Sequence, residues 1–102
     1  MNALMRMTQK VVPGKWAELD EIDKRFNVLE KRLGFPQNKK RYQCLMGAHD
    51  SNTLIIEYQW DSLAALEAVY EKAFADPEYQ AILNEVSSIV ESNQIEIYTQ
   101  LP

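Results

Sequence analysis

Along this chain the interval between hydrophobic residues changes between two residues, as in a strand, and three or four residues, as in a helix. The order of these changes limits the fold more than any other feature. In residues 2–12 apolar side chains alternate with polar ones, which predicts a β-strand that ends before Pro13 and Gly14. From residue 15 to Gly34 the apolar side chains recur every three or four residues, as on an amphipathic helix of about five turns. Glycine is a common C-terminal residue of helices, so we expect the helix to end there.

The second half of the chain repeats this change of period. Short alternating segments at 41–48 and 53–60 predict two strands, joined as a hairpin by turn-forming residues that include His49. A helical pattern then runs over 61–92, with Asp61 as its expected cap and a break at Asp76, because the next residue is proline. Alternation returns at 95–100 and predicts a final strand.

The order strand, helix, strand, strand, helix, strand predicts an α+β, ferredoxin-like βαββαβ sandwich. Two right-handed βαβ units give a four-stranded antiparallel sheet with both helices on one face. With 102 residues we expect one domain over 1–102. One parity of each strand should face the helices: Met5, Met7, Tyr42, Cys44, Met46, Leu54, Ile56, Tyr58, Ile95 and Ile97.

The opposite parity is mixed in character. It is too apolar for a face open to water and too charged for a dry core, where unpaired charge is costly. The simplest cover is a second copy of the same sheet, related by a two-fold axis, which predicts a homodimeric barrel with a partly polar lumen. Its residues are Leu4, Arg6, Thr8, Arg41, Gln43, Leu45, Ile55, Glu57, Gln59, Glu96, Tyr98 and Gln100.

Five polar residues of this parity are the candidate substrate-binding site. Arg6 and Arg41 could hold a carboxylate or enolate of a small organic ligand through paired hydrogen bonds, with Glu96 beside them. Glu57 could act as a general base if burial raised its pKa, and Tyr98 could donate a proton or stack on a ring. In the alternative interpretation the charged residues form ion pairs that fix the dimer, and Tyr98 fills space in the lumen.

Composition excludes several classes of protein. Eleven basic and fifteen acidic residues give a net charge of −4, which argues against a nucleic-acid-binding protein. One cysteine cannot form an internal disulfide, and one cysteine with one histidine is too few for a zinc site of soft ligands, so we expect no metal and no cofactor. No Ser–His–Asp or Cys–His–Asn triad signature stands out, and any such triad would have to use His49. We expect Cys44 to be a small buried hydrophobic residue and His49 to be a turn residue.

The sequence also predicts the cellular location of the protein. No apolar run approaches the ~20 residues of a membrane span. The start MNALMRMTQK lacks the apolar middle of a signal peptide, so we expect a cytoplasmic protein without a membrane partner. An RNA-recognition module shares the βαββαβ order, but residues 53–60 lack the glycine and basic residues of its signature.

Residues 57–82, EYQWDSLAALEAVYEKAFADPEYQAI, carry a family resemblance. An aromatic-rich strand is followed at once by a helix, which is interrupted by Asp76 and Pro77 with an acid and an aromatic residue behind them. This arrangement resembles the dimeric α/β-barrel superfamily, in particular NIPSNAP-like and antibiotic-biosynthesis-monooxygenase-like domains. The haem-degrading members carry a histidine on the second helix; this chain has none there, so the resemblance implies no haem.

The resemblance implies a homodimer that binds a small organic molecule. Its members include cofactor-free monooxygenases, so one expectation is a cofactor-independent monooxygenase-like enzyme acting in the barrel lumen. Members without assigned activity leave a second expectation open, a non-catalytic homodimer that binds a ligand or a protein, because fold alone does not select a function.

Overall fold

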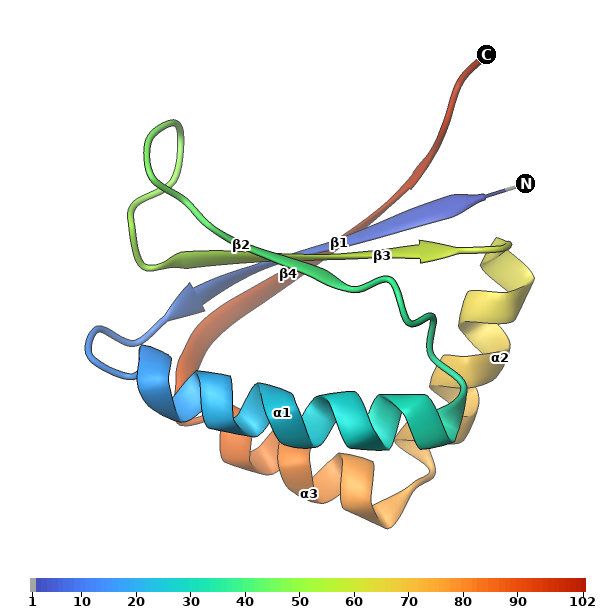
Figure 1. Ribbon diagram of the computed structural model, residues 1–102, viewed down its shortest axis with the longest axis horizontal. Helices are drawn as coiled ribbons and strands as arrows, with labels where there is room; N and C mark the ends of the chain where they lie inside the picture. Colours follow the sequence, from blue (N-terminus) through green and yellow to red (C-terminus); the bar gives the residue numbers. More distant parts are fainter. Residues whose placement is uncertain (1) are drawn as a thin grey trace.

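An antiparallel sheet with helices on one side forms the protein (Figure 1). The computed structural model describes residues 2–102. Its elements in chain order are β1 (Ala3–Val11), α1 (Trp16–Leu33), β2 (Lys40–Gln43), β3 (Thr53–Trp60), α2 (Leu63–Phe74), α3 (Pro77–Val86) and β4 (Val90–Thr99).

The order of strands across the sheet is β2-β3-β1-β4 within the described residues. The first strand is therefore central and pairs antiparallel with both β3 and β4. Each βαβ crossover places its helix on the same face of the sheet, which we call the inner face; the bare face is the outer face. The predicted α+β ferredoxin-like fold is confirmed.

The ends of the helices follow from local chemistry. Gly34 adopts a φ of +94°, which few residues with a side chain tolerate, and its N–H donates to the carbonyl of Glu30 at 3.0 Å. The predicted break at Asp76 is confirmed, since its Oδ1 accepts from the backbone N–H groups of Glu78 and Tyr79. The expected cap at Asp61 is wrong, because the hydroxyl of Ser62 accepts from the N–H of Ala65 at 3.0 Å instead.

The second strand departs most from the prediction. It ends at Gln43 rather than 48, and residues 44–52 form a loop in which the thiol of Cys44 donates to the carbonyl of His49 at 3.2 Å. Leu45 and Met46 of this loop are about nine-tenths exposed. The expectation that Cys44 and Met46 face the helices is therefore wrong.

The register of the second strand also reverses the expected faces. Arg41 lies opposite Ile56, which is buried under the helices, and Tyr42 lies opposite Ile55 on the outer face. Arg41 is thus on the inner face, not the outer one as predicted. The physical reason is ion pairing with acidic residues of α1, described below, which outweighs the weak apolar alternation of so short a strand.

The last strand begins at Val90, since α3 ends at Val86 and not near 92 as the pattern suggested. Ile95 and Ile97 lie opposite Met7 and Met5, so their inner-face parity is as predicted. They are nevertheless about half exposed, and every residue from 91 to 99 is exposed. This edge of the sheet has little cover from the helices.

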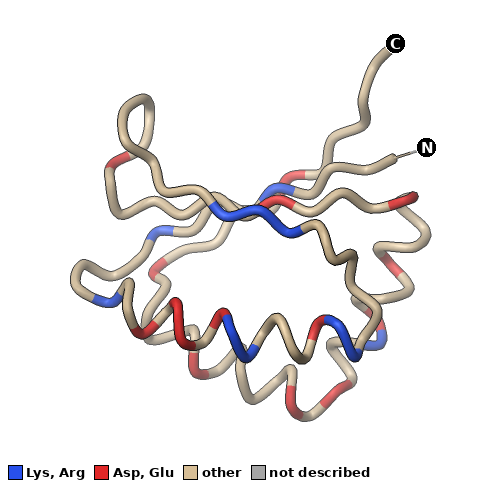
Figure 2. Tube along the Cα trace, viewed as in Figure 1, with Lys and Arg blue, Asp and Glu red and all other residues tan. Residues whose placement is uncertain are grey.

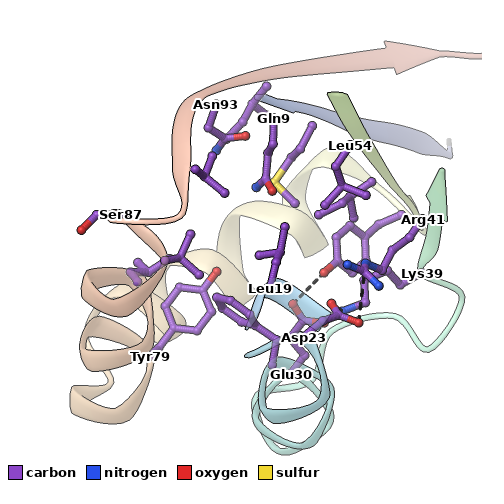
Figure 3. A pocket seen from close by; sticks show the side chains of 18 of the residues that line it. Gln9, Leu19, Asp23, Glu30, Lys39, Arg41, Leu54, Tyr79, Ser87 and Asn93 are labelled. Atoms are coloured by element: carbon purple, nitrogen blue, oxygen red, sulfur yellow. Dashed lines mark hydrogen bonds and ion pairs between the residues drawn. The ribbon is translucent and has the colours of Figure 1, made fainter. Parts of the chain in front are cut away.

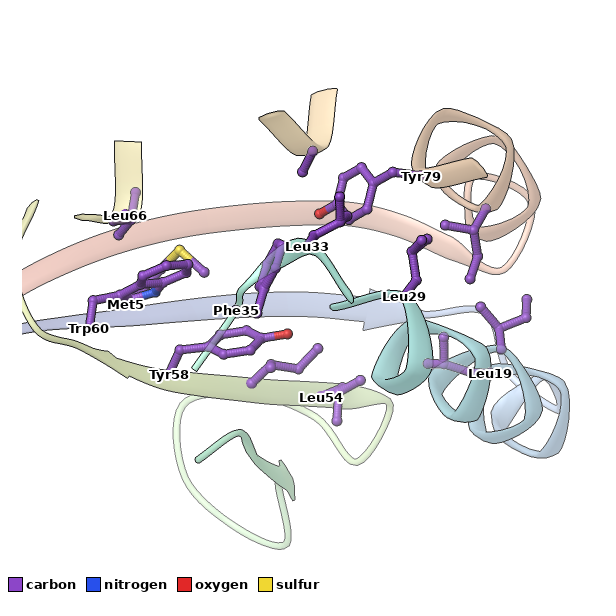
Figure 4. Packing of buried hydrophobic residues seen from close by; sticks show 14 of the residues in the cluster. Met5, Leu19, Leu29, Leu33, Phe35, Leu54, Tyr58, Trp60, Leu66 and Tyr79 are labelled. Carbon is purple, nitrogen blue, oxygen red and sulfur yellow. The ribbon is translucent and has the colours of Figure 1, made fainter. Parts of the chain in front are cut away.

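The hydrophobic core lies between the inner face and the helices (Figure 4). Phe35, just past the end of α1, is 3% exposed and lies at its centre. Its ring centroid is 5.1–6.0 Å from four aromatic rings. These rings come from β3, α2 and α3 and belong to Tyr58, Trp60, Tyr70 and Tyr79. Burial of aromatic area of this kind dominates core energetics.

Candidate functional site

A cavity of about 320 Å³ lies between the inner face of the sheet and the helices (Figure 3). Most of its wall is apolar or aromatic, and charged side chains gather at one end. A concave, largely apolar site with a few converging polar groups is the usual form of a small-molecule site. Its aromatic lining residues are Phe26, Tyr58, Tyr70, Phe74 and Tyr79.

The charged end is a buried cluster of Asp23, Glu30, Lys39 and Tyr58, which we call the ionic cluster. The Nζ of Lys39 lies 2.8 Å from Asp23 Oδ1 and 3.2 Å from Glu30 Oε1. The hydroxyl of Tyr58 donates to Glu30 Oε2 at 2.6 Å. The side chain of Glu30 is 8% exposed and that of Lys39 is 11% exposed. Both charges are therefore held mainly by protein groups and not by water.

The sequence builds this cluster from two elements. Asp23 and Glu30 are seven residues apart, two helical turns, so they lie on one face of α1. Lys39 and Arg41 flank the start of β2 and lie two residues apart, on one side of an extended chain. Basic and acidic positions are interspersed along α1 and the strands above it (Figure 2).

Arg41 extends the cluster towards solvent. Its Nη2 donates to Asp20 Oδ1 at 3.0 Å, and its Nε lies 3.6 Å from Asp23 Oδ2. That Nε is buried and has no hydrogen-bond acceptor among residues 2–102. A second, polar cavity of about 450 Å³ is lined by Asp23, Glu30, Lys39 and Arg41 together with loop residues. The ionic cluster thus borders an apolar cavity and a polar one.

Burial changes the proton affinities here. It raises the pKa of Glu30, although Lys39 and the hydroxyl of Tyr58 both act to lower it. Burial, with the nearby Glu30 carboxylate, also raises the pKa of Tyr58 well above its ordinary value. Burial raises the pKa of Tyr79 to about 12. The cavity therefore holds a carboxyl group that ionises at a higher pH than usual, beside phenols that remain neutral donors.

Four of the five predicted site residues come together, on the outer face. Arg6 Nε is 2.9 Å from Glu57 Oε2, and the Arg6 guanidinium lies 5.2 Å from the centroid of the Tyr98 ring. The hydroxyl of Tyr98 donates to Glu96 Oε2 at 2.7 Å. Arg41, on the inner face, is separated from them by the sheet. None of these four lines the cavity described above.

Sequence reasoning missed Glu30, Lys39 and Asp23. A signal was present, because Glu30 follows Phe26 by four residues and Asp23 follows Leu19 by four, so each carboxylate lies beside the apolar stripe of its helix. A charge at such a position needs a partner, and β2 supplies it. The pairing of Lys39 with Asp23 and Glu30 joins segments that are apart in the sequence, so the spacing of apolar residues does not predict it.

Two further observations concern residues 2–102. No three His, Cys, Asp or Glu side chains in this part of the chain are arranged to hold a metal ion. None of its helices combines the length and apolar character that crossing a membrane requires.

Comparison with solved structures identifies proteins of the same fold. The chain superposes on an uncharacterized NIPSNAP domain protein from Burkholderia xenovorans with a TM-score of 0.81, at 19% identity, covering 99% of this chain and 95% of that one. A NIPSNAP family protein from Agrobacterium tumefaciens gives 0.80 at 17% identity, covering 98% and 86%. SnoaB, a cofactor-independent oxygenase from Streptomyces nogalater, gives 0.70 at 12% identity, covering 97% and 92%.

The resemblance drawn from residues 57–82 is confirmed at the level of fold, because NIPSNAP proteins and an oxygenase of the related type are both structural neighbours. The sequence matches no protein-family model and none of the curated proteins with which it was compared. At these identities the likeness carries the fold and not the function.

Proposed function

We propose that this protein is a cytoplasmic homodimer that binds a small, mostly apolar organic molecule in the cavity beneath its sheet, with Glu30 accepting a proton from that molecule. The observation that carries the proposal is a buried carboxyl group at the polar end of an aromatic-lined cavity. A ligand with a planar ring and one acidic hydroxyl matches a cavity that is aromatic along its wall and polar at one end. The ring would lie against Phe26 and Tyr79, and the hydroxyl would lie at Glu30.

The chemistry is a single proton transfer. The ionised carboxylate of Glu30 takes the proton from a phenol or enol, and the electron pair of the broken O–H bond stays on the substrate as a phenolate or enolate. Because its pKa is raised, Glu30 is a stronger base than an exposed glutamate. The ammonium of Lys39, 3.2 Å from Glu30, can stabilise the new anion.

The oxygenase among the structural neighbours supports a function that begins with removal of a proton from a phenol or enol. Electron-rich phenolates and enolates are the forms of an organic substrate that dioxygen oxidises directly, which is the chemistry a cofactor-independent oxygenase needs. SnoaB is such an enzyme by its description and shares this fold. This moves the proposed site from the space between two sheets to the inner face of one chain.

A second candidate function is ligand binding without catalysis. Both carboxylate oxygens of Glu30 already have donors within the chain, from Lys39 and from Tyr58. A fully satisfied buried carboxylate can be purely structural. In that case the cavity would hold the ligand through its aromatic wall, and no proton would move.

Binding of 1-naphthol, with naphthalene as the matched probe without a hydroxyl, distinguishes these functions. We expect both to bind, and the absorbance of bound 1-naphthol to show a larger ionised fraction than free 1-naphthol at the same pH. Glu30→Gln should retain binding and lose this increase. If 1-naphthol binds un-ionised to the wild type, the non-catalytic function is supported. If neither probe binds, the proposed site is wrong.

The homodimer is supported by the outer face, which the helices leave bare (Figure 1). It carries Leu4, Ile55 and the partly exposed Tyr98 beside charged residues. An apolar surface of this kind on a small protein commonly marks an interface. Light scattering at micromolar concentration should give twice the mass of one chain, and a monomer would contradict this part of the proposal.

A further inference from the structure

The wall of the cavity carries a buried amide group away from the ionic cluster. Gln9 lies on β1, and Figure 3 shows its side chain pointing from the sheet into the cavity. The residue is only 9% exposed, yet no hydrogen bond within residues 2–102 uses its side-chain amide. Buried polar groups are normally paired, and an unpaired one costs free energy. The amide of Gln9 is therefore available to a ligand in the cavity.

Glu30 and Gln9 are both buried polar residues of the cavity wall, but they differ in their hydrogen bonds. The two carboxylate oxygens of Glu30 accept from Lys39 and from Tyr58. Gln9 has no such partner in the part of the chain that the structure describes. The contacts of Glu30 are thus made within the protein, whereas Gln9 contributes an amide to the cavity alone.

The strand register places Gln9 well apart from the charged end of the cavity. Gln9 of β1 lies opposite Leu54 of β3. Arg41 of β2 lies opposite Ile56, two residues further along β3. Gln9 and Arg41 are thus two strands and two residues apart, which corresponds to about 12 Å between their Cα atoms. A ligand can therefore present one group to Glu30 and a different group to Gln9.

The Gln9 end of the cavity is bordered by exposed residues at the end of α3 and the start of β4. The register of β1 and β4 shifts between Lys10 and Val11, which leaves Glu91 as an extra residue in β4. Such β-bulges are common beside active sites, where they redirect side chains. The exposed lining residues at this end are Ser87, Glu91, Ser92 and Asn93.

The charges around the cavity favour a neutral ligand group at Gln9. Both basic residues of the cavity wall, Lys39 and Arg41, lie at the other end and pair with acidic residues of α1. The charged residue beside the Gln9 end is Glu91, whose carboxylate repels an anion. A carboxylate on the ligand would therefore be disfavoured at Gln9, and a neutral polar group would not.

The amide of Gln9 has two kinds of hydrogen-bonding group, a carbonyl acceptor and an NH₂ donor. A ketone would accept from the NH₂ group and leave the carbonyl oxygen of Gln9 unpaired. A carboxamide would pair with both groups through two parallel hydrogen bonds, so it loses less free energy on burial. Asn93 lies opposite Gln9 on β4 and also lines the cavity, which adds a second amide at this end.

We propose that the cavity recognises a hydroxylated aromatic carboxamide, whose hydroxyl lies at Glu30 and whose carboxamide forms paired hydrogen bonds with the side chain of Gln9. This inference rests on the proposed function, because it names the chemical class of the ligand in the same cavity. Gln9 is then a binding residue that sets specificity, and Glu30 remains the base.

Three naphthalene compounds test the carboxamide. 1-Naphthamide carries it, methyl 1-naphthyl ketone has a methyl group in place of the NH₂, and naphthalene has neither polar atom. We expect the wild type to bind 1-naphthamide roughly three- to tenfold more tightly than the ketone, because one more hydrogen bond forms. Gln9→Met should remove this preference and leave the binding of naphthalene unchanged. Isothermal titration calorimetry measures the dissociation constants.

Gln94→Met is the matched control. It makes the same substitution at an exposed residue of β4 that lies opposite Thr8 on the outer face, and it should leave all three dissociation constants unchanged. Urea unfolding without ligand distinguishes binding from a structural role. Gln9→Met should not lower the free energy of unfolding, because the amide has no partner to lose within residues 2–102. A clear loss of stability would assign Gln9 to the structure and overturn the inference.

The outcomes separate this inference from the proposed function. A wild type that binds the ketone as tightly as 1-naphthamide, or a preference that survives Gln9→Met, overturns the carboxamide. If 1-naphthol still shows its increased ionisation, the proton transfer to Glu30 is then unaffected. A preference that depends on Gln9 while 1-naphthol binds un-ionised supports the carboxamide and contradicts the proton transfer. If no probe binds, both proposals are wrong.

Discussion

The two faces of the sheet carry the same kinds of charged residue and hold them in different ways. On the inner side, Lys39 has two carboxylates within 3.2 Å, and all three groups are largely buried. On the outer face, the next residue, Lys40, is exposed and has no carboxylate within 4.0 Å among residues 2–102. The difference teaches that burial obliges a chain to supply its own counter-charges, whereas exposed charges can be left for a second molecule.

Neighbouring isoleucines on β3 give the largest expected contrast. Ile56 is 8% exposed under the helices, and Ile55 faces outward. We expect Ile56→Ala to lower the free energy of unfolding by about 3 kcal/mol, because it leaves a cavity in the core. Ile55→Ala should cost about 1 kcal/mol or less. Urea unfolding at one fixed protein concentration measures both, and equal costs would mean that the faces are wrongly assigned.

Adjacent lysines give the next contrast. Lys39→Met leaves the Asp23 and Glu30 carboxylates buried without their ammonium group, and we expect a loss of about 3 kcal/mol of unfolding free energy. Lys40→Met should change it by less than about 0.5 kcal/mol. The same urea titration compares the pair. A small effect at Lys39 would show that water reaches the ionic cluster.

The pH dependence of stability sharpens the comparison at Glu30. Burial raises its pKa above that of the unfolded chain, so its contribution to stability is complete below the ordinary glutamate pKa. That contribution is lost as the pH rises through the raised pKa of the folded state. Glu30→Gln cannot ionise. We therefore expect the wild type to lose stability relative to the variant as the pH rises above the ordinary glutamate pKa, measured by denaturant unfolding. Parallel curves would contradict this prediction.

The smallest expected effect is at the Arg6–Glu57 ion pair on the outer face. The Arg6–Glu57 pair is partly exposed, so Arg6→Met should cost less than about 1 kcal/mol in unfolding free energy. Its effect should diminish further in high salt, because exposed ion pairs are screened. A loss comparable to that of Lys39→Met would place Arg6 in a buried network.

Sequence periodicity predicted the fold where an element has one strong apolar face. The strand Thr53–Trp60 and the first helix have such faces, and their bounds were predicted closely. The alternation of Tyr42, Cys44 and Met46 was misleading, because the strand is only four residues long and its side is set by Lys39 and Arg41 pairing with α1.

The candidate site was harder to predict than the fold. Arg6, Glu57, Glu96 and Tyr98 were correctly placed on one face, since they follow from strand parity and register. The ionic cluster depends on contacts between a helix and a strand edge that are far apart in sequence. No local sequence pattern specifies which lysine pairs with Glu30. The cavity and its buried carboxyl group could therefore be identified only from the tertiary structure.

The position of Phe35 has a consequence for the order in which the chain folds. It follows the first helix directly, yet its aromatic neighbours all lie in the second half of the chain. Non-local contacts of this kind form late and at an entropic cost of loop closure. Nascent protein that lacks its second βαβ unit would leave this ring in water, so we expect both halves to acquire structure in a single cooperative transition.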